Sequence, residues 1–272
     1  MTSRDGQEDR GGDLALRLLS AAVLIPFGLF VVYQGGLFLL VASGLFAALM
    51  AYEWVRMSAS PSMKLLVALA IAPFIVAAIW GLTFGLLALA LAGLIACFTH
   101  PLAGLRVTEG FGLFYVAGMS FALYYLREGP WDGVAAALIF MGIVWGSDAA
   151  AYFAGKGFGG PALHPDSPSK TWSGAIGAVI FSTICGLLAA RITGGDQTVW
   201  LLTGALISVF AQIGDLFEST LKRRFGVKDA SGFLPGHGGV LDRVDGLGFV
   251  CVFTVVLFLL VPALTVTLGL SG

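Results

Sequence analysis

The chain has 272 residues, of which 58% are hydrophobic and only 11% are charged, and its mean hydropathy is +0.92. Soluble globular domains carry about 25% charged residues, so this composition excludes an ordinary soluble protein and predicts one that lies in a membrane. The formal net charge of −1 indicates no particular partner. The three cysteines lie inside apolar runs without metal-ligand spacing, which predicts buried small residues rather than disulfides or zinc ligands. They are Cys97, Cys185 and Cys251.

The N-terminal part begins with residues 1–13, MTSRDGQEDRGGD, which are polar and mixed in charge and predict a disordered tail. The remainder, residues 14–272, is predicted to form one transmembrane domain. Residues 18–52 carry no charge, and the single polar break at Gln34, followed by two glycines, predicts two spans folded as a hairpin. This apolar run exceeds the roughly 7–15 residues of a signal-peptide core, so we do not expect it to be cleaved.

A second charge-free run, residues 65–99, breaks near Trp80 and Gly81 and predicts another hairpin. Either half is short for a span, which needs about 20 residues. Three further spans are predicted at about residues 111–126, 133–155 and 171–190. An eighth runs from about residue 199 into a polar stretch that begins at residue 219, and a ninth runs from residue 246 to near the C-terminus. The total is nine, so we expect an all-α, polytopic membrane bundle of about nine transmembrane helices.

The distribution of basic residues predicts how these spans are oriented. Short cytoplasmic loops are enriched in Lys and Arg. With the N-terminus in the cytoplasm, all but two of the fifteen Lys and Arg residues lie inside, and only Arg127 and Arg191 lie outside. We therefore predict a cytoplasmic N-terminus, and we expect Arg127 and Arg191 to tolerate substitution without a kinetic effect.

A polar stretch, residues 219–245, lies between the last two predicted spans and reads STLKRRFGVKDASGFLPGHGGVLDRVD. It holds five of the fifteen Lys and Arg residues and one of the three His residues. Charge gathered at one place in a membrane protein usually marks the functional site. The orientation above places this stretch at the cytoplasmic face.

The helix that leads into this stretch carries Gln212, Asp215, Glu218, Ser219 and Lys222. Residues spaced by three or four positions share one face of a helix, so these side chains predict a polar stripe at its cytoplasmic end. One interpretation is an ion-pair network that only holds helices together. The other is a functional site, because a carboxylate at this depth needs a cation, a metal or water.

Further carboxylates favour the functional interpretation. Asp242 and Asp245 lie one turn apart in LDRVD, and Asp148 interrupts the sixth predicted span. Several carboxylates beside a cluster of Lys and Arg are what a site needs to hold Mg²⁺ and a polyphosphate together. The sequence therefore predicts a metal and phosphate site.

Three glycine-containing or basic segments flank these carboxylates. LPGHGGVLD combines a stiffening Pro235 with glycines that allow close approach to a ligand, and His237 could donate to a phosphate or cap a turn. GKGFGG at residues 155–160 lacks the ending of a P-loop and is weak evidence by itself. SPSKTWSG places Lys170 and Thr171 near a helix N-terminus, which suits an anion, although the segment also fits an ordinary interfacial anchor with Trp172 at headgroup level.

The polar stretch resembles the C-terminal motif of the phosphatidate cytidylyltransferases, or CDP-diacylglycerol synthases. It matches S-x-x-K-R-x4-K-D-x5-P-G-H-G-G-x-x-D-R-x-D at thirteen positions over twenty-seven residues. SDAAAYFAGKGFG and SPSKTWSG resemble two upstream segments of the same family, so specific motifs reach from about residue 145 to residue 245. The chain departs from relatives at Ser169 and Ser173, to which we assign no role.

The resemblance implies that CTP and phosphatidate react to give CDP-diacylglycerol and pyrophosphate with Mg²⁺, in an integral protein of a prokaryotic inner membrane whose site faces the cytoplasm. It also suggests a homodimer. The expected metal ligands and catalytic carboxylates are Asp215, Asp242, Asp245 and Asp148, with Lys222 as a catalytic cation. The expected substrate-binding residues are Lys170, Arg223, Lys228, Asp229, His237, Gly238, Gly239, Arg243 and Ser219.

Three alternatives stay open at this point. A CTP-dependent lipid kinase would use similar carboxylates and cations but would transfer the γ-phosphoryl group. A cytidylyltransferase for another lipid phosphate would differ only in its apolar pocket. An ion-coupled transporter would also carry intramembrane carboxylates, although glycines and cations gathered on one face fit it less well.

Overall fold

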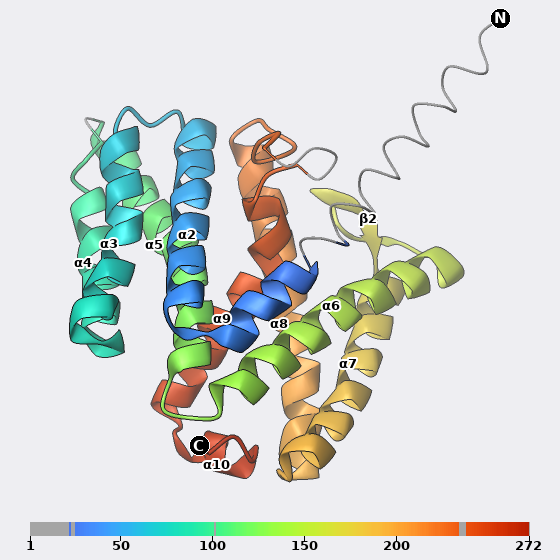
Figure 1. Cartoon of the computed structure of the whole chain (residues 1–272). Helices are drawn as coiled ribbons and strands as arrows, with labels where there is room; N and C mark the ends of the chain where they lie inside the picture. Colours follow the sequence, from blue (N-terminus) through green and yellow to red (C-terminus); the bar gives the residue numbers. More distant parts are fainter. Residues whose placement is uncertain (1–21, 23–24, 101, 234–237, 272) are drawn as a thin grey trace, which may run out of the picture.

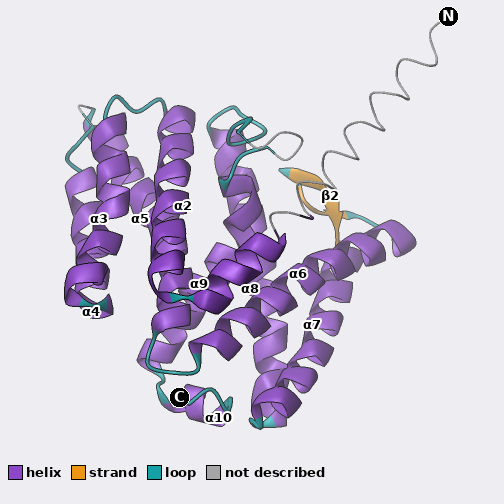
Figure 2. Cartoon of the chain, viewed as in Figure 1, coloured by secondary structure: helices purple, strands orange, loops and turns teal. Residues whose placement is uncertain are grey.

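The computed structural model describes residues 22, 25–100, 102–233 and 238–271, and this part of the chain is a helical bundle with a small β-hairpin (Figures 1 and 2). The predicted tail at residues 1–13 and His237 lie outside the described residues. The helices are Ile25–Gln34, α2 (Gly36–Ser58), α3 (Met63–Trp80), α4 (Leu82–Ala96), α5 (Ala103–Glu128), α6 (Gly133–Phe158), α7 (Trp172–Thr193), α8 (Gln197–Arg224), α9 (Leu241–Leu260) and α10 (Ala263–Thr267). The hairpin pairs β1 (Ala162–His164) with β2 (Ser167–Thr171) in antiparallel fashion.

Six of the described helices are long and apolar enough to cross a membrane, namely α2, α3, α6, α7, α8 and α9. The predicted all-α membrane bundle is therefore confirmed, whereas the predicted number of nine spans is not. Ile25–Gln34 and α4 are apolar but shorter, because each shares one apolar run with its hairpin partner. Helix α5 has 26 residues but is less apolar, since Gly, Ser and Tyr interrupt its hydrophobic residues.

Both predicted hairpin breaks are confirmed. Gly35 has φ +64° and separates Ile25–Gln34 from α2, and Gly81 has φ +94° and separates α3 from α4. Only glycine adopts such positive φ angles at little cost, so each helix ends where the sequence places a glycine after its apolar run.

Helix α9 joins two groups of helices. Helices α2 to α5 pack together on one side, and α6, α7 and α8 pack together on the other, while α9 contacts both α5 and α8 (Figure 1). Because successive helices alternate in direction, the segment between α8 and α9 lies at the same end of the bundle as the β-hairpin, and α10 lies at the opposite end (Figure 1). This arrangement gathers the polar segments of the sequence at one end.

The turn before α2 is held by a charged pair at the end of α5. The Arg127 Nε donates to the Val32 carbonyl oxygen at 2.8 Å, and its Nη2 donates to the Tyr33 carbonyl oxygen at 3.0 Å. The neighbouring Glu128 Oε1 accepts from the Gly36 backbone N–H at 2.8 Å. These bonds satisfy backbone groups that helix ends leave without partners.

We therefore expect Arg127→Gln to destabilise the protein, by about 1–3 kcal/mol, because it leaves two carbonyl oxygens without their charged donor. Thermal unfolding of the detergent-solubilised chain measures the effect. Arg191→Gln is the matched control, since Arg191 is exposed on α7. Equal midpoints for the two variants would contradict this role of Arg127, and the expected kinetic tolerance of both positions stays a prediction.

Candidate functional site

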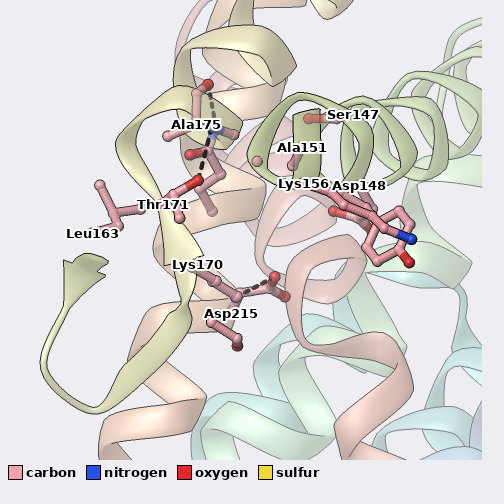
Figure 3. Close-up of a pocket in the computed structure, with 14 residues that line it drawn as sticks. Ser147, Asp148, Ala151, Lys156, Leu163, Lys170, Thr171, Ala175 and Asp215 are labelled. Atoms are coloured by element: carbon pink, nitrogen blue, oxygen red, sulfur yellow. Dashed lines mark hydrogen bonds and ion pairs between the residues drawn. The ribbon is translucent and has the colours of Figure 1, made fainter. Parts of the chain in front are cut away.

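A cavity of about 400 Å³ opens between α6, α7, α8 and the β-hairpin (Figure 3). Its polar side chains come from α6, β2 and α8, although its surface is mostly apolar. Helix α6 supplies Asp148 and Lys156, β2 supplies Lys170, and α8 supplies Gln212 and Asp215. Residues as far apart in the sequence as Asp148 and Asp215 thus meet around one cavity, and that cavity carries charges of both signs.

Lys170 and Asp215 form the central contact of this cavity. The Lys170 Nζ lies 2.5 Å from the Asp215 Oδ2, and both side chains are only partly exposed (Figure 3). Asp148 is exposed to the cavity and lies within electrostatic range of both groups. The Thr171 Oγ1 accepts from the Gly174 backbone N–H and caps α7. Lys170 therefore stands at a helix N-terminus as expected, but on a strand that carries it into the cavity.

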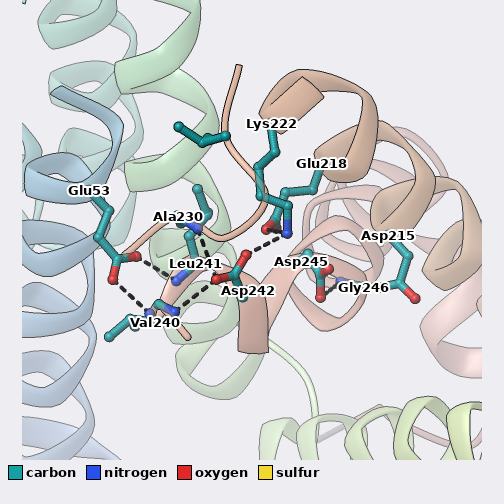
Figure 4. Close-up of polar contacts among 12 residues, drawn as sticks. Glu53, Asp215, Glu218, Lys222, Ala230, Val240, Leu241, Asp242, Asp245 and Gly246 are labelled. Carbon is teal, nitrogen blue, oxygen red and sulfur yellow. Dashed lines mark hydrogen bonds and ion pairs between the residues drawn. The ribbon is translucent and has the colours of Figure 1, made fainter. Parts of the chain in front are cut away.

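A second polar group, here called the Lys222 cluster, consists of Glu218, Lys222 and Asp242 (Figure 4). The Lys222 Nζ donates to the Glu218 Oε1 at 2.9 Å and to the Asp242 Oδ1. The Asp242 Oδ2 accepts from the backbone N–H groups of Ala230 at 3.0 Å and Gly239 at 2.8 Å. The three charged side chains are almost fully buried, with 1%, 13% and 6% exposed for Glu218, Lys222 and Asp242. One cation thus serves two buried carboxylates.

Asp245 lies between the cavity and the Lys222 cluster. Its Oδ1 accepts from the Gly246 backbone N–H at 2.9 Å (Figure 4), and its carboxyl group lies within electrostatic range of that of Asp215. Helices α8 and α9 approach closely here, because Gly214 of α8 lies against the Asp245 backbone of α9 and Gly246 of α9 lies against the Asp215 carboxylate of α8. Small residues at such contacts are typical of membrane helices. The glycines therefore bring two carboxylates of different helices together.

The carboxylate pair fits Mg²⁺ in the manner of nucleotide sites. Among the described residues, no three His, Cys, Asp or Glu side chains are grouped closely enough to hold a metal by themselves. Mg²⁺ commonly binds through one or two carboxylates and completes its shell with water and substrate phosphates. Within the described part of the chain, the buried Glu218 Oε2 and Tyr115 hydroxyl have no hydrogen-bond partner, and both groups lie near Asp245. These unpaired oxygens suit a site completed by a bound cation or water.

Of the other predicted site residues, Asp242, Gly238 and Gly239 lie at or beside the Lys222 cluster, and the remaining ones lie elsewhere on the structure. Asp242 has both oxygens engaged by protein donors, so its predicted metal role stays a prediction. Gly239 is buried and Gly238 has φ +78°, and both lie against Asp242 or the residues that contact it. Ser219 is partly buried on α8, and four further residues are exposed and are not among the described residues that line the cavity: Arg223, Lys228, Asp229 and Arg243.

Sequence reasoning assigned no role to Glu53, which the structure places beside the Lys222 cluster. Only 1% of Glu53 is exposed, and its carboxylate reaches from α2 to the start of α9 (Figure 4). The available signal was an acidic residue directly after a charge-free run of 35 residues, at a depth where carboxylates are costly.

Comparison with known proteins identifies the family. The model of the cytidylyltransferase family matches residues 15–261. The chain belongs to this family. A phosphatidate cytidylyltransferase of Brucella suis biovar 1 (strain 1330) is 39% identical over 249 residues, which cover 86% of this chain and 89% of the relative. One of Staphylococcus aureus (strain COL) is 41% identical over 143 residues, which cover 52% and 55%. The resemblance stated from the motifs is confirmed, and it extends into the N-terminal half of this cytidylyltransferase.

The close contact of α8 and α9 leads to a prediction at Gly246. A Cβ there would lie 3.2 Å from the Asp215 Oδ1 and 3.2 Å from the Ala211 carbonyl oxygen, closer than such atoms normally pack. We expect Gly246→Ala to lower kcat by roughly ten- to a hundredfold, because small displacements of catalytic groups are costly. The control is Gly142→Ala on α6, where a Cβ would meet nothing within 4 Å. Equal turnover in the two variants would contradict the prediction.

Proposed function

We propose that this cytidylyltransferase transfers the cytidylyl group of CTP to phosphatidate and makes CDP-diacylglycerol for phospholipid synthesis. A phosphate oxygen of phosphatidate attacks the α-phosphorus of CTP, the bond from that phosphorus to the bridging oxygen of the β-phosphate breaks, and pyrophosphate leaves. The observation that carries the proposal is the Lys170–Asp215 contact in a cavity that Asp148 also lines, within a chain of this family.

The residues of the site supply positioning and charge. Asp215 and Asp245 would hold Mg²⁺, with Asp148 near Asp215 on α6, and the ion when bound would neutralise phosphate charge. Lys170 is released from Asp215 to contact phosphate oxygens, and Lys156 stands at the same cavity. Lys222 keeps the first turn of α9 in place through Asp242. No covalent intermediate is required, because in-line orientation and charge neutralisation suffice for this transfer.

We also propose the finer membrane arrangement. The six long helices together with Ile25–Gln34, α4 and α5 give nine crossings and a cytoplasmic N-terminus, in the inner membrane of a prokaryote. The proposal is supported by the distribution of the Lys and Arg residues. Most of them lie at the ends of α2, α6 and α8, at the starts of α3 and α5, and on β2, and these places lie toward the end of the bundle with the β-hairpin (Figure 1). CTP would enter from the cytoplasm and phosphatidate from the inner leaflet, where basic residues attract anionic lipid. A homodimer is proposed on the family resemblance.

Two labels on CTP test the proposed reaction. The purified chain is incubated with Mg²⁺, phosphatidate and CTP labelled at either the α- or the γ-phosphate. We expect α-label in the lipid product and γ-label in pyrophosphate, and removal of divalent cations by a chelator abolishes both. Label from the γ-phosphate in the lipid would instead indicate a kinase. Absence of any labelled lipid, with CTP-independent uptake by vesicles, would indicate a transporter.

Replacing phosphatidate by an ether-linked lipid phosphate tests the third alternative. We expect faster labelling of phosphatidate than of the ether lipid when the two are compared at equal surface concentration. A clear preference for the ether lipid would reassign the substrate while leaving the reaction type unchanged.

A further inference from the structure

The buried carboxylate of Glu53 connects the N-terminal helices to the start of α9. Its Oε1 accepts from the Ser231 Oγ at 2.6 Å and from the Val240 backbone N–H at 2.8 Å. Its Oε2 accepts from the Leu241 backbone N–H at 2.8 Å (Figure 4). Every bond joins residues more than 170 positions apart, so α2 contacts the middle of the segment between α8 and α9 and also its junction with α9.

These bonds cap α9 from another helix. The first N–H groups of a helix have no partner within the helix, and its N-terminus carries partial positive charge. The residue before α9, Val240, makes no capping bond with its own side chain, so Glu53 supplies both the acceptor and the negative charge. A buried carboxylate at this depth is tolerated because three donors compensate it.

A second carboxylate fixes the same segment from the α9 side. The Asp242 Oδ2 accepts from Ala230 and Gly239, the direct neighbours of two residues that Glu53 contacts. Ala230 and Ser231 on one side, and Gly239 to Leu241 on the other, are therefore held by two carboxylates of different helices. Asp245, which faces Asp215, lies one turn beyond this fixed point.

We infer that Glu53 is a positioning residue that sets the place of Asp242 and Asp245 relative to Asp215. It does not line the cavity formed by α6, α7, α8 and the hairpin, so it acts through α9 rather than by touching substrate. The inference rests on the proposed function, in which Asp215 and Asp245 hold Mg²⁺. Partners that orient metal ligands typically change metal affinity by about 10- to 100-fold when they are replaced.

Glu53→Gln tests the inference in the full-length, detergent-solubilised protein. The amide keeps the shape of the side chain, removes its charge, and can turn only one oxygen toward three donors. We expect the Mg²⁺ concentration for half-maximal activity, and the dissociation constant of Mn²⁺ measured by electron paramagnetic resonance, to rise by about 10- to 100-fold. We also expect faster amide hydrogen exchange at the start of α9.

The matched control is Asp196→Ala, which removes a capping bond at the N-terminus of α8, far from this site. In that bond the Asp196 Oδ1 accepts from the Val199 backbone N–H at 2.9 Å. It should lower thermal stability without changing metal dependence. Ser231→Ala removes one of the three Glu53 bonds and should shift Mn²⁺ binding in the same direction by a smaller factor. This variant keeps the inference testable if Glu53→Gln does not fold.

Two results would overturn the inference. Glu53→Gln could behave like Asp196→Ala, with lower stability but unchanged Mn²⁺ binding, which would make Glu53 a structural cap only. Alternatively, exchange at the start of α9 could be unchanged in both Glu53→Gln and Ser231→Ala. If the unaltered chain made no CDP-diacylglycerol, the proposed function would fail, whereas hydrogen exchange and Mn²⁺ binding would still decide the role of Glu53.

Discussion

Asp215→Asn is expected to lower kcat by a hundredfold or more, the order of magnitude lost when a preorganised electrostatic contact to the reacting phosphate is removed. Asp215 has two charged neighbours, because its carboxylate pairs with Lys170 and lies within electrostatic range of that of Asp245. Asparagine keeps the shape of the side chain but leaves Lys170 without a charged partner and the proposed Mg²⁺ site with one carboxylate fewer. Single-turnover kinetics with CTP labelled at the α-phosphate measure the chemical step directly.

Asp132→Asn is the control for this change. The Asp132 side chain caps α6 at the end of that helix away from Asp148 by accepting from the Ala135 backbone N–H at 3.1 Å. Asparagine also caps helices well, so we expect nearly unchanged stability and turnover. The metal-site proposal would be wrong if asparagine at each of Asp215, Asp245, Asp148 and Asp242 left activity close to that of the unaltered chain.

The features that could be predicted from the sequence are those that neighbouring residues determine. Glycines that follow apolar runs end Ile25–Gln34 and α3, so both hairpin turns were predicted at the correct residues. Helical spacing alone places Glu218 and Lys222 on one face of α8, and their side chains do form an ion pair at 2.9 Å. The motifs of the polar stretch also led to the correct family.

Contacts between distant segments could not be predicted in the same way. Lys170 and Asp215 are 45 residues apart, and Glu53 and Leu241 are 188 apart. Their meeting depends on how α7 packs against α8 and how α9 packs against α5, which no local pattern specifies. The sequence treated Asp242 and Asp245 as equivalent candidate metal ligands, and their predicted roles stay predictions. In the structure Asp242 is engaged by Lys222 and two backbone N–H groups, whereas Asp245 faces Asp215.

Lys222→Met is expected to destabilise the protein by about 3–5 kcal/mol, because it leaves two buried carboxylates without their cation. Glu218 and Asp242 have side chains only 1% and 6% exposed, so water cannot replace the lost charge. The length of methionine is close to that of lysine, and the change therefore removes charge with little change in volume. Chemical unfolding of the detergent-solubilised chain measures the difference in the free energy of unfolding. The control is Lys156→Met, which changes an exposed lysine that lies over the Tyr152 ring and should lower that free energy by about 1 kcal/mol or less.

A double-mutant cycle separates the loss of the ion pair from the cost of the unpaired charges. Glu218→Gln removes one of the two carboxylates, so adding it to Lys222→Met should restore part of the lost stability. We expect a coupling free energy of roughly 0.5–3 kcal/mol, the range found for residues in one contact network. Strict additivity of the two changes would mean that Lys222 serves Asp242 alone. In that case the lysine would still hold the start of α9, but Glu218 would be free to turn its carboxylate toward Asp245 and the proposed metal site.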